Sequence, residues 1–403
     1  MTGWLLMSVQ SPAVPSSPAR FRPTVARIDL SAIRHNCRVV RSHLPSPDTS
    51  ILVAVKAGAY GHGLLEVSRV LEDEGVDWLG VALVEEGLVL RNGGLQLPIL
   101  VLGGLMDGSE DAALGAGLSP VVYRAESARR LDAAGMRQGR KVPVHIKVDT
   151  GMGRLGVPVR DLASFLDGLG ELPHIEVDGV LTHLAEAENP QDQFTQGQLQ
   201  AFSSAVDTIR ARGHRPSWVH AANSAALMAG RHPDESTGAN LVRPGISIYG
   251  HPPDPALAGH WPLRSAMSLE TVILYLKSIP KGHCISYGLT WRAERDTVVA
   301  TVPVGYGDGY ARGLGNQAHA LVGGRRVPVV GRVCMDLTLL DVTDVPGVAQ
   351  GDPVVLVGTQ GDEQVTVSEL ADLLGTIPYE VLCAISPRVP RVHHDSELAN
   401  RAE

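Results

Sequence analysis

Apolar runs rich in Val, Ile and Leu alternate with helix-like segments along the first part of the chain. Eight such runs occur, at residues 51–56, 76–82, 98–102, 120–123, 143–148, 177–183, 217–221 and 241–243. Between most of them, apolar residues recur at intervals of three and four, which is typical of amphipathic helices. Residues 28–44 predict a short strand followed by a helix capped by Ser31. The pattern therefore predicts eight strands that alternate with helices.

Strands that are nearly continuous apolar runs belong to a parallel sheet covered on both faces. Eight strand–helix units in roughly 200–250 residues match the size of a (β/α)8 barrel, the TIM-type fold. A doubly wound open sheet is the alternative. It predicts a GxGxxG fingerprint after the first strand, and the GHG at 61–63 does not match that motif.

The pattern changes after about residue 262, where short strand-like runs are bounded by Gly, Pro and Asp. Such runs predict a second domain that is mostly antiparallel β-sheet. We therefore expect a flexible leader over 1–23, the barrel over 24–262, the β domain over 263–391 and a tail over 392–403. The strand near 24–30 is a candidate to join the β domain.

Composition excludes several classes of protein. The net charge of −8 leaves no basic footprint for nucleic acid. The four cysteines lie far apart without a CxxC pair, which is typical of a reducing compartment. No stretch approaches the ~20 apolar residues of a membrane span, and GWLLMSV near the start is too short for a signal peptide. These features predict a cytoplasmic protein with no nucleic-acid or membrane partner.

Polar and titratable residues follow several of the predicted strands. In a barrel of this kind, catalysis takes place at the carboxyl ends of the strands. Taken alone, a lysine after a strand is usually solvated, and a histidine there is usually a hydrogen-bonded core residue. Their shared location at one rim favours a functional site. The residues are Lys56, Lys147, Arg154, His183, His220, Asn223, Ser224 and Arg243.

The kinds of residue at this rim favour a cofactor over a metal. His62, His183 and His220 lack a carboxylate at ligand spacing, and neither HExxH nor GxSxG occurs. What remains is a lysine beside glycine-rich turns, with arginines and tyrosines. That set suits a Schiff-base lysine that holds a phosphorylated cofactor, with backbone amides binding the phosphate.

Nine segments, in order from about residue 24 to residue 391, resemble the alanine racemases. They are AVKAGAYGHG, HIKVDTGMGRLG, LTHLAEAEN, HAANSAALM, RPGISIYG, ISYG, VGYGDGY, GRVCMDLTLLDV and TIPYEVLCAISPRVPR. The resemblance implies an α/β-barrel isomerase that uses pyridoxal 5'-phosphate to interconvert L-alanine and D-alanine. It also implies a role in supplying D-alanine for cell-wall peptidoglycan.

The resemblance implies roles for the matching residues. Lys56 would hold the cofactor as a Schiff base and act as one catalytic base, and Tyr287 matches the second base. Arg243 matches the arginine at the pyridine nitrogen, with His220 and Asn223 as supporting residues. The phosphate-binding set is matched by Tyr60, Ser224, Gly245, Ile246 and Tyr379.

Other matches concern the substrate and the partner subunit. Arg154 matches the arginine that steadies the cofactor's phenolic oxygen and contacts substrate, and Lys147 matches a lysine often carbamylated in this family. His183 matches a residue packed against the cofactor ring. Met335 and Asp336 match a substrate-binding pair, and Tyr306 and Arg312 match the passage through which substrate enters. In this family Tyr287, Tyr306, Met335 and Asp336 reach the partner's site, which implies an obligate homodimer with shared sites.

The chemistry of racemisation agrees with two bases. One base cannot easily serve both faces of a planar carbanion, whereas two bases on opposite sides can. Lysine and tyrosine side chains ordinarily have pKa values of about 10, so both would need lowered pKa values to act as bases. The sequence also departs from the family, since Gly58 stands where Asn or Asp is usual, and the family's acid after the TH motif appears here as Glu188, a conservative change.

Two rival hypotheses remain open at this point. One is a same-fold enzyme of another reaction, such as an amino-acid decarboxylase or a racemase of serine or broader range. Arg243 argues against the decarboxylase, because those enzymes use an acidic residue at the pyridine nitrogen. The other is a pyridoxal-phosphate carrier without catalysis, which would not need the long β domain.

Overall fold

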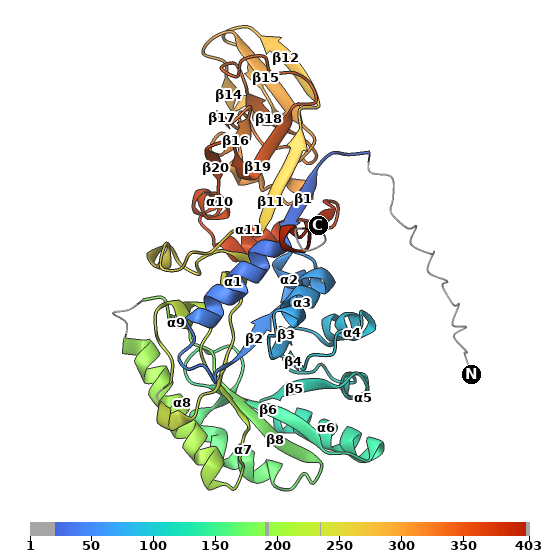
Figure 1. Ribbon diagram of the computed structural model, residues 1–403, viewed down its shortest axis with the longest axis vertical. Coiled ribbons are helices and arrows are strands. Elements are labelled where there is room, and N and C mark those ends of the chain that lie inside the picture. Colours follow the sequence, from blue (N-terminus) through green and yellow to red (C-terminus); the bar gives the residue numbers. More distant parts are fainter. Residues whose placement is uncertain (1–20, 190–192, 234, 400–403) are drawn as a thin grey trace, which may run out of the picture.

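The structure is a computed structural model of the chain, and it describes residues 21–189, 193–233 and 235–399. Most of the predicted leader, residues 1–20, lies outside this part. The molecule is elongated, with a barrel at one end and a β domain at the other (Figure 1). None of the helices in the described ranges has the length and apolar character needed to cross a bilayer.

The barrel contains eight parallel strands in the order β10-β2-β3-β4-β5-β6-β8-β9. The ring closes between β9 and β10, where Asn223 and Arg243 form a parallel bridge. A short additional strand, β7 (Val157–Pro158), pairs with β6. The predicted (β/α)8 barrel is thus confirmed. The ring strands are β2 (Ser50–Ala54), β3 (Trp78–Val81), β4 (Ile99–Val101), β5 (Leu118–Val122), β6 (Val142–Asp149), β8 (Ile175–Leu181), β9 (Trp218–His220) and β10 (Leu241–Val242).

Helices cover the outside of the ring (Figure 1). The pattern predicted most of them but neither of the short helices α5 and α9. They are α1 (Leu30–Ser42), α3 (Leu64–Asp73), α4 (Val84–Asn92), α5 (Glu110–Gly115), α6 (Ala125–Gln138), α7 (Leu162–Leu169), α8 (Gln193–Ala211) and α9 (Ser224–Met228).

The predicted cap of α1 is wrong. Asp29, not Ser31, caps the helix, because its carboxylate accepts hydrogen bonds from the amides of Ser31 at 2.9 Å and Ala32 at 3.2 Å. The Ser31 hydroxyl donates to the same carboxylate. The aspartate two residues earlier is an equally good capping residue, so the helix begins before Ser31.

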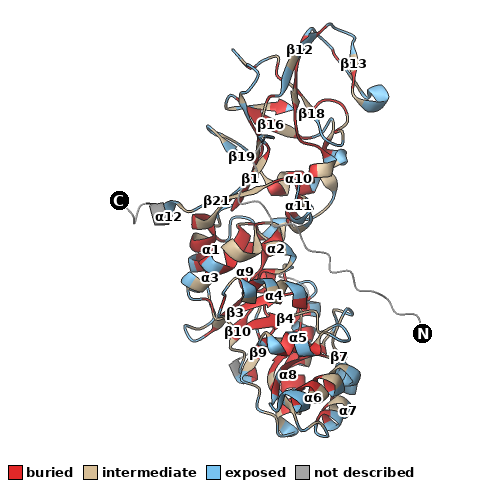
Figure 2. Cartoon of the chain, turned by 90° about the vertical axis from the view of Figure 1, so that its right-hand side faces the viewer, coloured by how far each residue is buried: buried red, intermediate tan, exposed pale blue. Residues whose placement is uncertain are grey.

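An apolar layer fills the ring just before the strands reach the rim. Its members come from six strands and are Leu52, Trp78, Leu100, Val121, Leu181 and Leu241. Strand side chains alternate between faces with a period of two. Arg243 lies two residues after Leu241 and continues its inward face into the polar rim, whereas Lys56 lies beyond Ala54, the last residue of β2. Both faces of the ring strands are covered, so most of their residues are buried (Figure 2).

The β domain is built around one sheet with the order β17-β16-β19-β11-β1-β21. All its pairings are antiparallel except that of β1 with β21, which is parallel. The predicted, mostly antiparallel β domain is therefore confirmed. Its strands are β1 (Val25–Asp29), β11 (Met267–Val272), β16 (His319–Val322), β17 (Arg325–Pro328), β19 (Pro353–Gln360), β20 (Glu363–Val365) and β21 (Arg391–His394).

Smaller elements complete this domain. One three-stranded sheet and one hairpin lie toward its far end, and two helices lie toward the barrel (Figures 1 and 2). These elements are β12 (Tyr275–Ile279), β15 (Thr297–Val302) and β18 (Thr338–Asp341), the hairpin β13 (Cys284–Ile285) with β14 (Trp291–Arg292), and the helices α10 (Val367–Leu374) and α11 (Pro378–Ala384).

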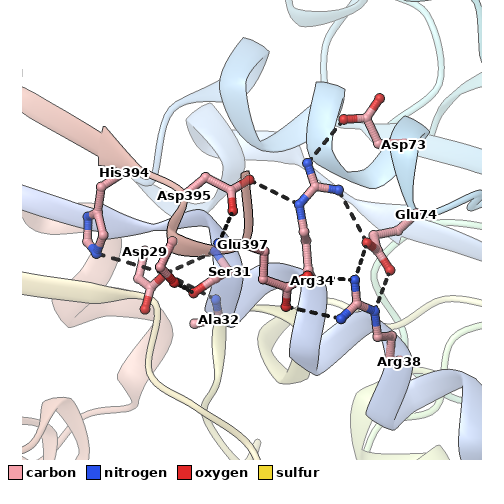
Figure 3. Close-up of polar contacts among 11 residues, drawn as sticks. Asp29, Ser31, Ala32, Arg34, Arg38, Asp73, Glu74, His394, Asp395 and Glu397 are labelled. Atoms are coloured by element: carbon pink, nitrogen blue, oxygen red, sulfur yellow. Dashed lines mark hydrogen bonds and ion pairs between the residues drawn. The ribbon is translucent and has the colours of Figure 1, made fainter. Parts of the chain in front are cut away.

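Two arginines of α1 connect the two ends of the chain (Figure 3). The guanidinium of Arg34 contacts Asp73 at 3.1 Å, Glu74 at 3.2 Å and Asp395 at 3.0 Å. Its side chain is only 7% exposed. Arg38 adds contacts to Glu74 and to Glu397 of α12 (Ser396–Ala399). The network ties α1 and α3 to the segment after β21.

We expect Arg34→Ala to lower the free energy of unfolding by about 2–4 kcal/mol, because it removes a buried cation from Glu74 and Asp395, whose side chains are only 12% and 7% exposed. Urea denaturation followed by circular dichroism measures this loss. The matched control is Arg27→Ala, which breaks an exposed pair with Glu270 and should cost less than about 1 kcal/mol. Equal losses in the two variants would contradict a special role for the Arg34 network.

Candidate active site

One cavity of about 650 Å³ opens at the carboxyl ends of the barrel strands. Most of the barrel residues predicted from the sequence line it. The side chains come from different strands and loops, as expected for a barrel site. The predicted residues that line it are Lys56, Tyr60, Lys147, Arg154, His183, Asn223, Ser224, Arg243, Gly245, Ile246 and Tyr379.

Lys56 begins a turn with an unusual backbone. α2 (Lys56–Tyr60) continues from β2, but Ala57, Gly58, Ala59 and Tyr60 have φ values of 53°, 63°, 55° and 53°. Left-handed helical geometry costs L-residues roughly 1–2 kcal/mol each, and only glycine is spared. A Cβ at Gly58 would meet nothing within 4 Å, so glycine is needed there for φ rather than for space.

The β domain holds this turn from outside. Arg391 of β21 donates from Nε to the carbonyl of Gly61 at 2.8 Å, and His393 Nε2 donates to the carbonyl of His62 at 2.7 Å. A Cβ on Gly61 would lie 2.6 Å from the carbonyl oxygen of Leu382 in α11. Glycine is therefore required for the β domain to approach the turn this closely.

Aromatic stacking holds the end of the turn from inside. The Tyr60 ring lies 4.7 Å from that of Tyr249 and 5.8 Å from that of Tyr379, measured between centroids. Tyr249 donates its hydroxyl to the Ala54 carbonyl at 2.9 Å. Burial raises the pKa of the Tyr60 phenol, so this hydroxyl stays protonated and can donate a hydrogen bond.

The two lysines of the cavity are held toward the uncharged form. Burial and the positive charge of Arg154 lower the pKa of Lys56. Burial, with the charges of Arg243, Arg154 and Lys56, lowers the pKa of Lys147 to about 8. An unprotonated amine is the form that attacks carbonyl carbons, so the cavity favours nucleophilic lysine chemistry.

Arg243 begins a buried line of side chains through the barrel. One of its Nη atoms donates to His220 Nδ1 at 3.1 Å, and the other donates to the carbonyls of Thr182 at 2.6 Å and Ala221 at 2.9 Å. Because a guanidinium only donates, His220 Nδ1 accepts and its Nε2 carries the proton. That proton points to His145 Nδ1, 3.0 Å away.

The line ends at His145, in the middle of β6. His145 Nε2 is buried without a hydrogen-bond partner among the described residues, and Asp178 Oδ2 lies 4.0 Å away. Burial lowers the pKa of His145 to about 3 and lowers that of His220 well below its usual value. Both rings are therefore neutral at pH 7. Burial also lowers the pKa of Arg243 to about 10, which leaves it charged.

A small polar cradle lies between Tyr60 and β10. The Ser224 hydroxyl accepts from the amides of Gly245 at 2.8 Å and Ser247 at 3.4 Å. A Cβ on Gly245 would lie 2.7 Å from the Tyr60 hydroxyl. Glycine at this position thus brings a backbone amide, two hydroxyl groups and the cavity together, which suits an anionic group.

Besides the buried His220, which lies behind Arg243, five predicted residues do not line this cavity. Tyr287, Tyr306, Arg312, Met335 and Asp336 lie in the β domain. Tyr287 is 71% exposed and Met335 53% exposed. Tyr287 follows the hairpin strand β13, at the end of the molecule away from the barrel (Figure 2). The backbone amide of Tyr306 donates a hydrogen bond to the carbonyl of Cys334 at 3.0 Å. This bond places Tyr306 beside the segment that carries Met335.

Tyr287 is displayed by a strained backbone. Ser286, just before it, has φ 63° and ψ 176°, a region almost reserved for glycine. The Ser286 hydroxyl donates to the Arg332 carbonyl at 2.6 Å, which anchors the loop. A Cβ on Gly331 would lie 2.6 Å from the Ser286 Cβ, so the loop packs closely against its neighbour.

Several residues of the site were missed in the sequence analysis. His145 carried a readable signal, because it lies two residues before Lys147 on the same face of one strand. Arg391 and His393 carried none, since they reach the turn from the other end of the chain. No group of three or more His, Cys, Asp or Glu that could hold a metal occurs in the described part of the chain.

The chain is similar to known proteins over nearly its whole length. Family models of the alanine racemase N-terminal domain and C-terminal domain match residues 28–253 and 266–393. An alanine racemase from Symbiobacterium thermophilum is 45% identical over 374 residues, which is 92% of this chain and 97% of the relative.

Solved structures agree. An alanine racemase from Bacillus anthracis with bound L-Ala-P superposes with a TM-score of 0.86 at 35% identity, covering 94% of this chain and 97% of that one. An alanine racemase from Bartonella henselae with covalently bound pyridoxal phosphate gives a TM-score of 0.82 at 28% identity, covering 92% and 99%.

The buried histidines predict how stability depends on pH. In the folded protein, burial lowers the pKa of His62, beside the turn, to about 3. In the unfolded chain the pKa of a histidine is about 6.5. As pH falls between about 6 and 4, the unfolded state takes up a proton that the folded state does not, so stability is lost. We expect His62→Phe to remove about 1.4 kcal/mol per pH unit from this slope.

Urea denaturation at a series of pH values measures the slope, whatever the variant's absolute stability. The control is His283→Phe, which changes an exposed histidine of the β domain and should keep the wild-type slope. A His62→Phe variant with the full wild-type slope would show that His62 is not held neutral in the folded protein.

Proposed function

Because the chain belongs to the alanine racemase family, and is thus a pyridoxal-phosphate-dependent isomerase, we propose that it interconverts L-alanine and D-alanine with two bases, Lys56 and Tyr287. The observation that carries the proposal is the state of Lys56. Its pKa is lowered by burial and by the charge of Arg154 at the mouth of a barrel cavity. An amine of this kind can take a proton from carbon near neutral pH.

The cavity residues fit pyridoxal phosphate. The Lys56 amine would hold its aldehyde carbon, and Arg243 would face the pyridine nitrogen. The Tyr60 and Ser224 hydroxyls, with the amides of Gly245 and Ile246 and the hydroxyl of Tyr379, would bind the phosphate. The fit is supported by the cradle at Gly245, which a Cβ would fill. When bound, the cofactor acidifies the Cα–H of an attached amino acid by delocalising the electron pair left behind.

Arg243 sets the chemistry of the ring nitrogen. Arg243 remains charged at neutral pH because its lowered pKa is still about 10. His220 and two backbone carbonyls accept hydrogen bonds from its N–H groups. A donor that does not readily give up its proton leaves the ring nitrogen unprotonated. Arg243 at this position would therefore favour racemisation over transamination or decarboxylation, because it would not protonate the ring nitrogen.

Around the ring, Arg154 would steady the phenolic oxygen and contact the substrate, and His183 would pack against the ring. Burial and the charge of Arg243 lower the pKa of His183 well below its usual value, so it packs as a neutral ring. Lys147, with a pKa of about 8, is suited to carbamylation, which also needs a free amine. A carbamate there would orient Arg154.

The second base would come from another copy of the chain. Tyr287 is exposed and lies apart from its own cavity, in the β domain. Leu289 and Met335, which are also exposed and apolar, accompany it. We propose a homodimer in which Tyr287, Met335, Asp336, Tyr306 and Arg312 complete the cavity of the partner subunit. Tyr287 then faces the substrate from the side opposite to Lys56.

The setting of the activity is also a proposal. The family resemblance supports a cytoplasmic enzyme that supplies D-alanine for peptidoglycan. Alanine, the smallest chiral amino acid, suits a cavity already occupied by a cofactor and by residues from two subunits.

Lys56→Ala should abolish racemisation, and Tyr287→Phe should lower kcat by about 10²–10⁴-fold, because each removes a proton-transferring group. Loss of optical rotation of L-alanine at neutral pH, with added pyridoxal phosphate, measures both. The matched control is Tyr275→Phe, which alters another exposed tyrosine of the β domain and should retain wild-type kcat. Wild-type racemisation by Lys56→Ala would sink the proposal.

A shared site predicts complementation. When the inactive Lys56→Ala and Tyr287→Phe chains are unfolded together and refolded in equal amounts, each heterodimer gains one site with both bases intact. Random pairing makes half the dimers mixed, so activity should recover to about a quarter of wild type. Activity that stays at the level of the separate variants would place both bases in one chain.

A further inference from the structure

The left-handed turn after Lys56 needs support at its first residue. Its later residues are held by backbone bonds, from Ala59 N to Val55 O at 2.8 Å, Gly61 N to Ala57 O at 2.9 Å and Gly63 N to Gly58 O at 2.9 Å. The regular pairing of β2 with β3 stops just before it, at the bond from Val55 N to Gly80 O. The amide of Ala57 takes part neither in the backbone bonds of the turn nor in the β2–β3 pairing.

One side chain from α4 fills this gap. Glu86 accepts the Ala57 amide on Oε1 at 2.6 Å. Its other oxygen, Oε2, accepts the amides of Ala82 at 2.8 Å and Leu83 at 3.3 Å, just after β3. A single carboxylate thus joins the residue after Lys56 to the end of the neighbouring strand. It continues the β2–β3 pairing beyond the point where the backbones diverge.

We propose that Glu86 is a positioning residue for Lys56, holding the start of the left-handed turn to the end of β3 and so fixing the direction in which the lysine leaves β2. The inference rests on the proposed role of Lys56. Glu86 acts through Ala57 and not on the reacting atoms. Charged hydrogen bonds are shorter and stronger than neutral ones, so a carboxylate is well suited to hold strained backbone.

A simpler role would be capping of α4. Glu86 is the third residue of that helix, and a glutamate there commonly reaches back to the amide before the helix. Capping explains the bond to Leu83 but not the bond to Ala57, which belongs to a different strand. The two roles therefore predict different effects of substitution on the turn.

The test is amide hydrogen exchange by mass spectrometry on the full-length, cofactor-free protein. We expect Glu86→Ala to accelerate exchange of the amides of Ala59, Gly61 and Gly63 by about 10–100-fold, the range for losing a hydrogen bond to a charged group. These amides do not bond to Glu86, so they report the order of the turn. Peptides from β6 and α8 should keep wild-type exchange.

The matched control is Glu85→Ala, which removes an exposed carboxylate from the same turn of α4 and should leave the 57–63 peptide unchanged. Acceleration confined to the start of α4, with the 57–63 peptide at the wild-type rate, would overturn the proposal and leave Glu86 as a cap. If the Glu86→Ala protein does not fold, its amides exchange uniformly fast, and the same measurement on Glu86→Gln tests the proposal. It retains one acceptor oxygen, and the same pattern at about 3–10-fold is expected.

A second readout separates positioning from charge. The negative charge of Glu86 opposes the burial and the Arg154 charge that lower the pKa of Lys56. In Glu86→Gln, the pH midpoint for capture of pyridoxal phosphate by the cofactor-free protein should therefore move to lower pH. An unchanged midpoint together with unchanged exchange would leave Glu86 with no role at Lys56. Neither measurement depends on turnover, so failure here is distinct from failure of the two-base proposal.

Discussion

Backbone strain in one short turn is the constraint on which this structure depends. Four consecutive residues after Lys56 lie in left-handed geometry, and three of them are not glycine. Strain of this kind persists only where the surroundings over-determine it. Here Glu86 holds the turn from the barrel, Tyr249 stacks beneath it, and Arg391 and His393 hold its carbonyls from the β domain. The junction of the two domains and the turn that positions Lys56 are therefore one structure.

The barrel interior has two layers with different tasks. Aliphatic residues and Trp78 fill the lower layer, as in other barrels, but His145 and His220 pass through it as a neutral, hydrogen-bonded pair. Their neutrality follows from burial, which costs a charged group far more than a polar one. Because both rings are neutral, His145 and His220 add no positive charge beside the guanidinium of Arg243. The proposed control of the ring nitrogen thus begins well below the cavity.

Much of this architecture was predictable from the sequence. Eight apolar runs with helices between them indicate the barrel, since both faces of each strand are covered. Lys56, His183 and Arg243 were recognisable because each ends one of these apolar runs, where barrel enzymes carry their catalytic residues. The left-handed turn was not predictable, because Ala57, Ala59 and Tyr60 have no local preference for it. Glu86, Arg391 and His393 were also hidden, since tertiary contacts across the fold give them their part. The cap of α1 was misjudged because Asp29 and Ser31 compete at close spacing.

The hydrogen bonds from β21 to the turn form late during synthesis of the chain on the ribosome. Arg391 and the carbonyl it binds at Gly61 are separated by 330 positions in the chain. The ribosome therefore completes the whole barrel before the residues that secure the lysine turn emerge. A nascent barrel lacks β21, so its left-handed turn is held only from inside. The position of Lys56 is thus fully fixed only in the finished polypeptide, and a chain that ends before Arg391 lacks both of these bonds to the turn.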